Sequence, residues 1–201
     1  MFGFLPRPTL HLCAGIALSL VFQSAGFAAE NDLLSPEAGN WATDCLPNAC
    51  TLGLIMEAPQ DGGASTDGSA IQIVFQVDKK SRKGDLVVLT APPDADEGRG
   101  LIISFAKTVP DGDTTKMVVD KDTFLQLRFD NCDEDNCEIY LKEGKVNLGN
   151  GQTFDVTANF LKQDVFLAGF FQRGVIVRQS TALTTFKSDY DALVAKAKSE
   201  H

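Results

Sequence analysis

Four cysteines in two identical spacings are the residues of this chain best suited to chemistry. Cys45 precedes Cys50, and Cys132 precedes Cys137, by five positions each. Such pairs form disulfides in oxidising compartments, or hold structural zinc as thiolates. The Cys-x4-Cys spacing is permitted for zinc, but it differs from the Cys-x-x-Cys of thioredoxin-like redox centres.

The spacing favours disulfides that are local. Two residues five apart face each other across a four-residue hairpin loop, where opposed Cβ atoms lie close to the separation that a disulfide needs. We therefore predict Cys45–Cys50 and Cys132–Cys137, each contributing about 2 kcal/mol. A bond between the two regions would close a longer loop and contribute about 4.5 kcal/mol, so chain entropy alone leaves the other connectivities open.

The first residues predict the compartment. Arg7 precedes an apolar run, Leu12 to Phe22, which small residues follow up to Ala29. This order predicts a signal peptide over residues 1–28, cleaved after Ala28, because the run is too short for a membrane anchor. Cys13 stands near the start of the apolar run, whereas a lipid-modified cysteine should end it, so we interpret Cys13 as a removed residue and not as a lipid anchor. We expect residues 29–201 to form a single domain in the periplasm, or secreted or at the cell surface, where disulfides are favoured over zinc.

Candidate catalytic groups are few. After cleavage one histidine remains, the terminal His201, which excludes Ser-His-Asp and Cys-His catalysis. We predict that the chain is not an enzyme and assign no catalytic, cofactor-binding or metal-binding residue. The cluster Asp130, Asp133, Glu134, Asp135 and Glu138 could suit calcium, but it lacks the glycine and glutamate offsets of an EF-hand loop. A solvated acidic loop tip is the simpler interpretation.

The charge balance excludes some partners. There are 18 Lys and Arg against 27 Asp and Glu, a net charge of −9, which repels nucleic acid and anionic lipid. The one basic cluster, Lys79, Lys80, Arg82 and Lys83, is typical of a solvated hairpin tip, although it could contact an anionic partner. We expect no transmembrane segment after the signal.

Short strands dominate the elements that must position these residues. Ile71 to Val77 alternates apolar and polar residues, except at Val74, and Leu125, Leu127 and Phe129 alternate with Gln126 and Arg128. With Gly-, Pro- and Asp-rich turns between them, such strands predict an antiparallel β-sandwich or barrel. We expect strands at 49–57, 71–77, 86–89, 101–105, 124–129, 139–141, 154–160 and 175–177.

Two segments favour helices. Residues 163–173 place Val165, Phe166 and Phe170 at helical spacings, with Gly174 just past the end, although a strand is the rival interpretation. Phe186, Tyr190 and Leu193 predict a C-terminal helix near 184–198. Residues 58–68 are expected to form one mobile loop, and Trp41 is expected in the core beside the first disulfide.

Three groups of residues carry a resemblance to a known family. Trp41 precedes Cys45 and Cys50, Phe129-x-x-Cys132-x4-Cys137 follows, and Ser180-x-x-Leu183-x-x-Phe186-x3-Tyr190-x-x-Leu193 stands near the end. Their order resembles the invasion-associated locus B family of exported bacterial proteins. The chain departs from that pattern at Thr184-Thr185, where members carry a small residue and a glycine, at Asn136, where glycine is common, and in a longer stretch over 138–161. It therefore resembles a divergent member.

The resemblance implies an immunoglobulin-like β-sandwich without catalytic residues, and a role that in some pathogens is host-cell entry. We therefore expect an exported, non-enzymatic envelope protein that contacts an unknown protein in the envelope or on a host cell. The alternative is a periplasmic module that binds a small ligand in a pocket between the sheets, lined by some of the 14 phenylalanines.

Overall fold

The computed structural model describes residues 39–57, 70–80, 86–149 and 151–199, all within one compact unit of the chain. The predicted signal peptide at 1–28, the loop at 58–68, and Arg82, Lys83 and His201 lie outside the described residues.

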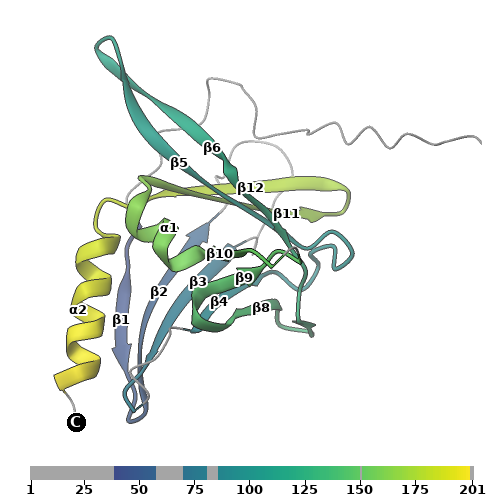
Figure 1. Cartoon of the computed structure of the whole chain (residues 1–201). Helices are drawn as coiled ribbons and strands as arrows, with labels where there is room; N and C mark the ends of the chain where they lie inside the picture. The colour runs from purple at the N-terminus through teal and green to yellow at the C-terminus, as the bar shows by residue number, and fades with distance from the viewer. Residues whose placement is uncertain (1–38, 58–69, 81–85, 150, 200–201) are drawn as a thin grey trace, which may run out of the picture. The chain divides into compact units, whose positions relative to one another are not determined.

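The larger of the two main sheets is six-stranded and antiparallel (Figure 1). Its order is β1-β2-β3-β4-β8-β7, so the first four strands form a meander. Buried and more exposed residues alternate along β3 and β4, as expected for strands with one face against a core. The strands are β1 (Ala42–Cys45), β2 (Ala49–Glu57), β3 (Ala70–Asp78), β4 (Leu86–Ala91), β7 (Asn131–Cys132) and β8 (Cys137–Leu141).

The second sheet has the order β12-β11-β5-β6 and is also antiparallel. It consists of β5 (Leu101–Asp111), β6 (Thr114–Leu127), β11 (Val165–Gln172) and β12 (Val175–Ala182). A short 3-10 turn, η1 (Lys142–Gly144), leads into a two-stranded ribbon of β9 (Lys145–Asn147) and β10 (Thr153–Asp155).

In the described part of the chain two helices complete the fold, α1 (Val156–Lys162) and α2 (Phe186–Ser199). The Asp155 carboxylate accepts a 2.7 Å hydrogen bond from the Ala158 N–H, which caps α1 at its start. Helix α2 lies along β1 and β2 of the larger sheet (Figure 1) and buries Phe186, Leu193 and Ala197.

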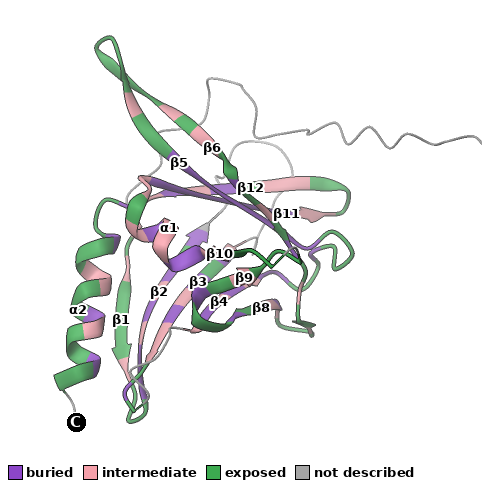
Figure 2. Cartoon of the chain, viewed as in Figure 1, coloured by how far each residue is buried: buried purple, intermediate pink, exposed green. Residues whose placement is uncertain are grey.

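Aromatic side chains fill the core where the sheets and helices meet. Phe160 of α1 has its ring centroid 5.0 Å from Phe75 of the larger sheet, 5.1 Å from Phe105 of the smaller sheet and 5.1 Å from Phe186 of α2. All four rings are at most 1% exposed. Trp41 is partly buried and packs against this core, with its ring centroid 4.9 Å from that of Phe186. The buried surfaces of both sheets line this one interior (Figure 2).

The main predictions of fold class are confirmed. The chain is mainly β, its sheets are antiparallel, and a C-terminal helix occupies Phe186–Ser199. The expected strand at 49–57 matches β2, and those at 71–77, 86–89, 101–105, 139–141 and 175–177 lie inside observed strands. The strand expected at 124–129 ends at Leu127.

Two expectations were wrong. Residues 163–173 do not form a helix, because Val165–Gln172 is the central strand β11, buried on both faces over its first six residues. Arg173 and Gly174 have φ of 49° and 82° and form the turn to β12, so the glycine interpreted as a helix stop closes a hairpin. The strand expected at 154–160 was also wrong. The strand β10 ends at Asp155, and the helix α1 begins at Val156.

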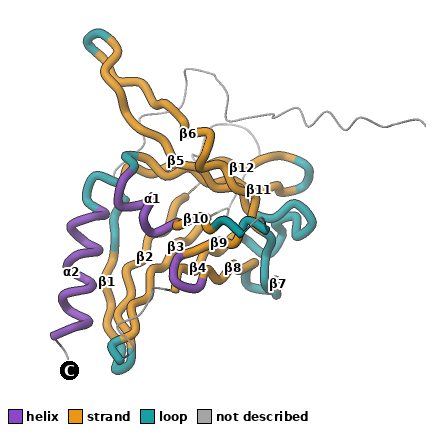
Figure 3. The backbone as a smooth tube through the Cα atoms, viewed as in Figure 1, coloured by secondary structure: helices purple, strands orange, loops and turns teal. Residues whose placement is uncertain are grey.

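The β5–β6 hairpin extends well past the sheet to which it belongs, as Figures 1 and 3 show. β11 pairs with β5 only as far as Ala106, whereas β5 and β6 remain paired up to Asp111 and Thr114. We call residues 107–119 the β5–β6 arm. No helix in the described residues is both long and apolar enough to cross a membrane.

Candidate functional site: the outer face of the six-stranded sheet

The four cysteines form the two predicted local disulfides, Cys45–Cys50 and Cys132–Cys137. Each pair is directly opposed across a hairpin, with Cα atoms 4.1 and 4.0 Å apart. This pairing leaves none of the four sulfurs as a thiolate for zinc.

The disulfides stand at the two edges of the same sheet. One joins the edge strand β1 to β2, and the other joins the edge strand β7 to β8. Cys50 lies opposite Val77 near the end of β3, whereas Cys137 pairs with Ala91 at the far end of β4. The bonds therefore hold diagonally opposite corners of the sheet, and both edge strands are very short.

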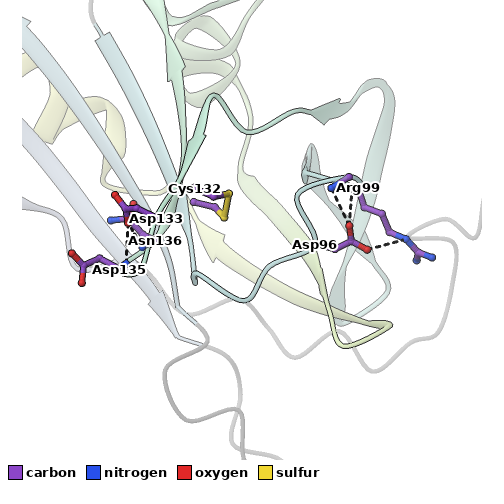
Figure 4. Close-up of a disulfide and its surroundings, with 8 residues drawn as sticks. Asp96, Arg99, Cys132, Asp133, Asp135 and Asn136 are labelled. Carbon is purple, nitrogen blue, oxygen red and sulfur yellow. Dashed lines mark hydrogen bonds and ion pairs between the residues drawn. A yellow bond between two sulfur atoms is a disulfide. The ribbon is translucent and has the colours of Figure 1, made fainter.

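The acidic loop between Cys132 and Cys137 is organised by its own backbone (Figure 4). The Asp133 carboxylate accepts hydrogen bonds from the N–H groups of Asn136 and Asp135, at 3.0 and 2.9 Å. These bonds favour the ionised form and lower the pKa of Asp133. Asp133 thus acts as a turn residue, and within the described ranges no three His, Cys, Asp or Glu side chains gather to hold a metal.

The same close-up shows a second polar turn, before β5 (Figure 4). Asp96 accepts from the backbone N–H groups of Gly98 and Arg99 and forms an ion pair with the Arg99 side chain at 3.5 Å. The Arg99 guanidinium lies 4.3 Å from the centroid of the Phe171 ring. These contacts fix the loop that leads into β5, so we interpret them as structural.

The outward face of the larger sheet carries apolar residues in register. Gly53 of β2, Val74 of β3, Val88 of β4 and Tyr140 of β8 lie side by side across four neighbouring strands. Val74 and Val88 are half-buried, and Tyr140 is 42% exposed. Ile55, two residues after Gly53 on the same face, is 60% exposed. We call Gly53, Ile55, Val74, Val88 and Tyr140 the outer apolar row.

Polar groups border this row on the β8 side. The Tyr140 hydroxyl donates a hydrogen bond to Glu138, and the Tyr140 N–H donates to the Asp130 carboxylate at 2.7 Å. Because the Glu138 carboxylate accepts a hydrogen bond from the neutral phenol and repels a phenolate, it raises the pKa of Tyr140. The apolar row thus ends at an acidic rim formed by Asp130 and Glu138.

The other candidate groups do not converge on this face. Lys79 is buried, and its N–H donates to the Asn48 carbonyl across the neighbouring hairpin. Of the predicted basic cluster only Lys79 and Lys80 are described. Among the phenylalanines considered for a ligand pocket, Phe75, Phe105, Phe160, Phe166 and Phe186 contact one another and are at most 1% exposed.

One feature of the sequence is a signal for the outer apolar row. Val74 interrupts the alternation of Ile71 to Val77 because it sits on the solvent face between Gln72 and Gln76. A valine at such a position is ordinary when taken alone, and only the register reveals that Val88 and Tyr140 stand beside it. Comparisons of the chain with protein-family models, with curated proteins and with solved structures give no match.

Proposed function

We propose that this chain is an exported, non-enzymatic protein that acts through protein contacts made by the outer apolar row, in the periplasm or at the cell surface. The observation that carries the proposal is the exposure of Ile55 and Tyr140 beside Val74 and Val88 on one sheet face. Contiguous exposed apolar side chains on a soluble domain are typical of protein interaction sites.

The row also has the composition of an interface. Aliphatic side chains form its middle, and Tyr140 lies at the end that meets the acidic rim of Asp130 and Glu138. Buried aromatic anchors with a polar border are usual in protein–protein contacts. The rim predicts a partner that presents lysine or arginine next to an apolar patch.

Export is supported by the two disulfides and by the signal-like first residues. The resemblance to the invasion-associated locus B family supports the same proposal and favours a partner in the bacterial envelope or on a host cell. A pocket between the sheets is a weaker basis for function, because the phenylalanines available for it pack against one another.

The proposal is tested with a matched pair of variants. Ile55 and Gln72 are directly opposed on the same face, so Ile55→Glu and Gln72→Glu place one carboxylate at neighbouring positions. Photo-crosslinking in envelope extracts, followed by mass spectrometry, should recover a partner with the unchanged protein and with Gln72→Glu but not with Ile55→Glu. Recovery of the same partner with all three proteins would refute this surface as the contact site.

A further inference from the structure

The β5–β6 arm has one blocked edge and one open edge. On the β5 side, the Thr108 N–H and hydroxyl both donate to the Asp164 carboxylate, at 2.8 and 3.2 Å. The next residue that faces the same way is Pro110, which has no N–H to donate. A carboxylate and a proline thus occupy the positions where another strand would pair with β5, a common means of protecting an edge.

The β6 side of the arm lacks this protection. Because the Thr108 N–H points away from β6, the opposed residues Thr108 and Met117 are a non-hydrogen-bonded pair. The N–H and C=O of Met117 therefore point away from β5, and alternation gives Thr115 and Val119 the same direction. In the described sheets no strand pairs with β6 on that side.

The side chains beside this open edge are self-complementary. Lys116, Val118 and Asp120 follow one another on a single face of β6, opposite Val109, Lys107 and Phe105. Val118 is 46% exposed. When two such strands run antiparallel with Val118 opposite Val118, Lys116 of each lies opposite Asp120 of the other. In an antiparallel pair of these strands, each positive side chain therefore faces a negative one and the apolar side chains face each other.

We propose that the β5–β6 arm is a self-association site, where β6 pairs antiparallel with β6 of a second copy about a two-fold axis at Val118. Met117 then lies opposite Val119 of the second copy, and these two equivalent pairs exchange about four backbone hydrogen bonds in all. The two sheets join into one across the axis, an isologous contact of the kind usual in homodimers.

The existing contacts of the charged residues permit this pairing. The Lys116 Nζ lies 3.5 Å from the Asp111 Oδ2, and both side chains are 57% exposed. An ion pair this exposed is weak, so Lys116 can leave Asp111 for another carboxylate. The Asp120 carboxylate accepts from the Gln163 side chain and the Asp122 N–H, at 3.2 and 3.1 Å. A carboxylate offers about four lone-pair sites, which leaves acceptor capacity for Lys116 of the second copy.

The other sheet edges fit a second copy less well. β1 and β7 have four and two residues and are joined to their neighbours by disulfides. β12 carries Arg178 as its single charged residue, so a two-fold pairing there would gain no opposite charge. Only β6 combines a long strand, an open edge and a self-matching charge order within the described residues.

Cross-linking tests the register of this contact. At a non-hydrogen-bonded antiparallel pair Cα atoms lie about 4.5 Å apart, within the range of a disulfide. Val118→Cys should therefore give a disulfide between the two introduced thiols of a chain pair under mild oxidation, identified by non-reducing peptide mapping. Val109→Cys is the matched control, because Val109 lies on the same face of the arm but on β5. Equal cross-linking of the two variants, or none, would overturn the proposal.

Sedimentation velocity on the otherwise unchanged protein provides a second measurement. We expect a concentration-dependent dimer at up to about 1 mM, lost in Val118→Lys and retained in Val109→Lys. Far-UV circular dichroism checks that both variants are folded. A monomer throughout this range, or a dimer that survives Val118→Lys, would contradict pairing at β6. Either result leaves the partner proposed for the outer apolar row untouched, because that row lies on the other sheet.

Discussion

At Gly100 the backbone enters β5 with φ of +66°, and a Cβ at this position would overlap the carbonyl oxygen of Leu127. Both the positive φ and the close approach require glycine. Gly112, at the tip of the arm, also has a positive φ, of +63°, but a Cβ there would meet nothing within 4 Å. A substitution at Gly112 would therefore cause backbone strain alone, whereas one at Gly100 would cause both backbone strain and a steric clash.

We expect Gly100→Ala to lower the free energy of unfolding by about 3 kcal/mol, because the Leu127 carbonyl must move. Gly112→Ala should cost about 1 kcal/mol, from backbone strain alone. Urea denaturation of the two variants measures the difference. Equal losses would show that the contact with Leu127 is unimportant.

The hydrogen bond between the Tyr140 hydroxyl and Glu138 should depend on pH. Glu138 raises the pKa of Tyr140, so the hydrogen bond persists while the phenol is protonated and is lost as pH rises through that raised value. Glu138→Gln removes the repelling charge and should lower the pKa of Tyr140. Ultraviolet titration measures this change, and a Tyr190→Phe background removes the only other tyrosine. An unchanged or higher pKa in Glu138→Gln would contradict the assignment.

At the scale of elements, the start of α1 depends on a single side chain. Asp155 accepts the Ala158 N–H at 2.7 Å, and its own carbonyl accepts from the Asn159 side chain at 2.8 Å. Asp155→Ala should lower the free energy of unfolding by about 1 kcal/mol. Asp155→Asn can still cap the helix, so its free energy of unfolding should stay close to that of the unchanged protein. Denaturant titration compares the two, and similar losses would exclude a capping role.

The Cys132–Cys137 disulfide should contribute measurably to the free energy of unfolding. Replacing Cys132 and Cys137 together by alanine removes a small closed loop and should cost at least about 2 kcal/mol. Cys137 is fully buried, so lost packing adds to this value. Thermal and urea denaturation measure it against the unchanged protein. A loss well below about 2 kcal/mol would mean that the β7–β8 hairpin is held by other contacts.

Elements with one clear periodicity could be predicted from the sequence, and ambiguous ones could not. The period of two over Ile71 to Val77 predicted a strand, and the Cys-x4-Cys spacing favoured local disulfides over the other connectivities. Both predictions are confirmed. Residues 165–171 are apolar throughout because the first six residues of β11 are buried on both faces, and an all-apolar run does not separate strand from helix. The arm and the outer apolar row depend on strand register, which tertiary pairing decides.

For the whole molecule, Phe160 is the side chain that connects the parts. Its ring meets Trp41, Phe75, Phe105, Phe166 and Phe186, which belong to both sheets, to α2 and to the segment before β1. Because one side chain contacts both sheets and α2 in a shared interior, we expect these parts to unfold together.

Phe160→Ala should therefore lower the free energy of unfolding by about 4 kcal/mol, with one cooperative transition retained. Phe186→Ala should cost a similar amount, and the double variant should lose less than the sum, because the rings share a contact at 5.1 Å. Calorimetry and urea denaturation provide both measurements. Strict additivity would show that the two rings act independently.

The placement of the disulfides has a consequence for a nicked chain. Each bond encloses only four residues, so it retains no fragment beyond its own hairpin. A protease that cuts a single peptide bond between Cys50 and Cys132 leaves two pieces without a covalent connection. Those pieces stay together only as long as the aromatic interior does, and denaturation after one cut would release them without any reductant.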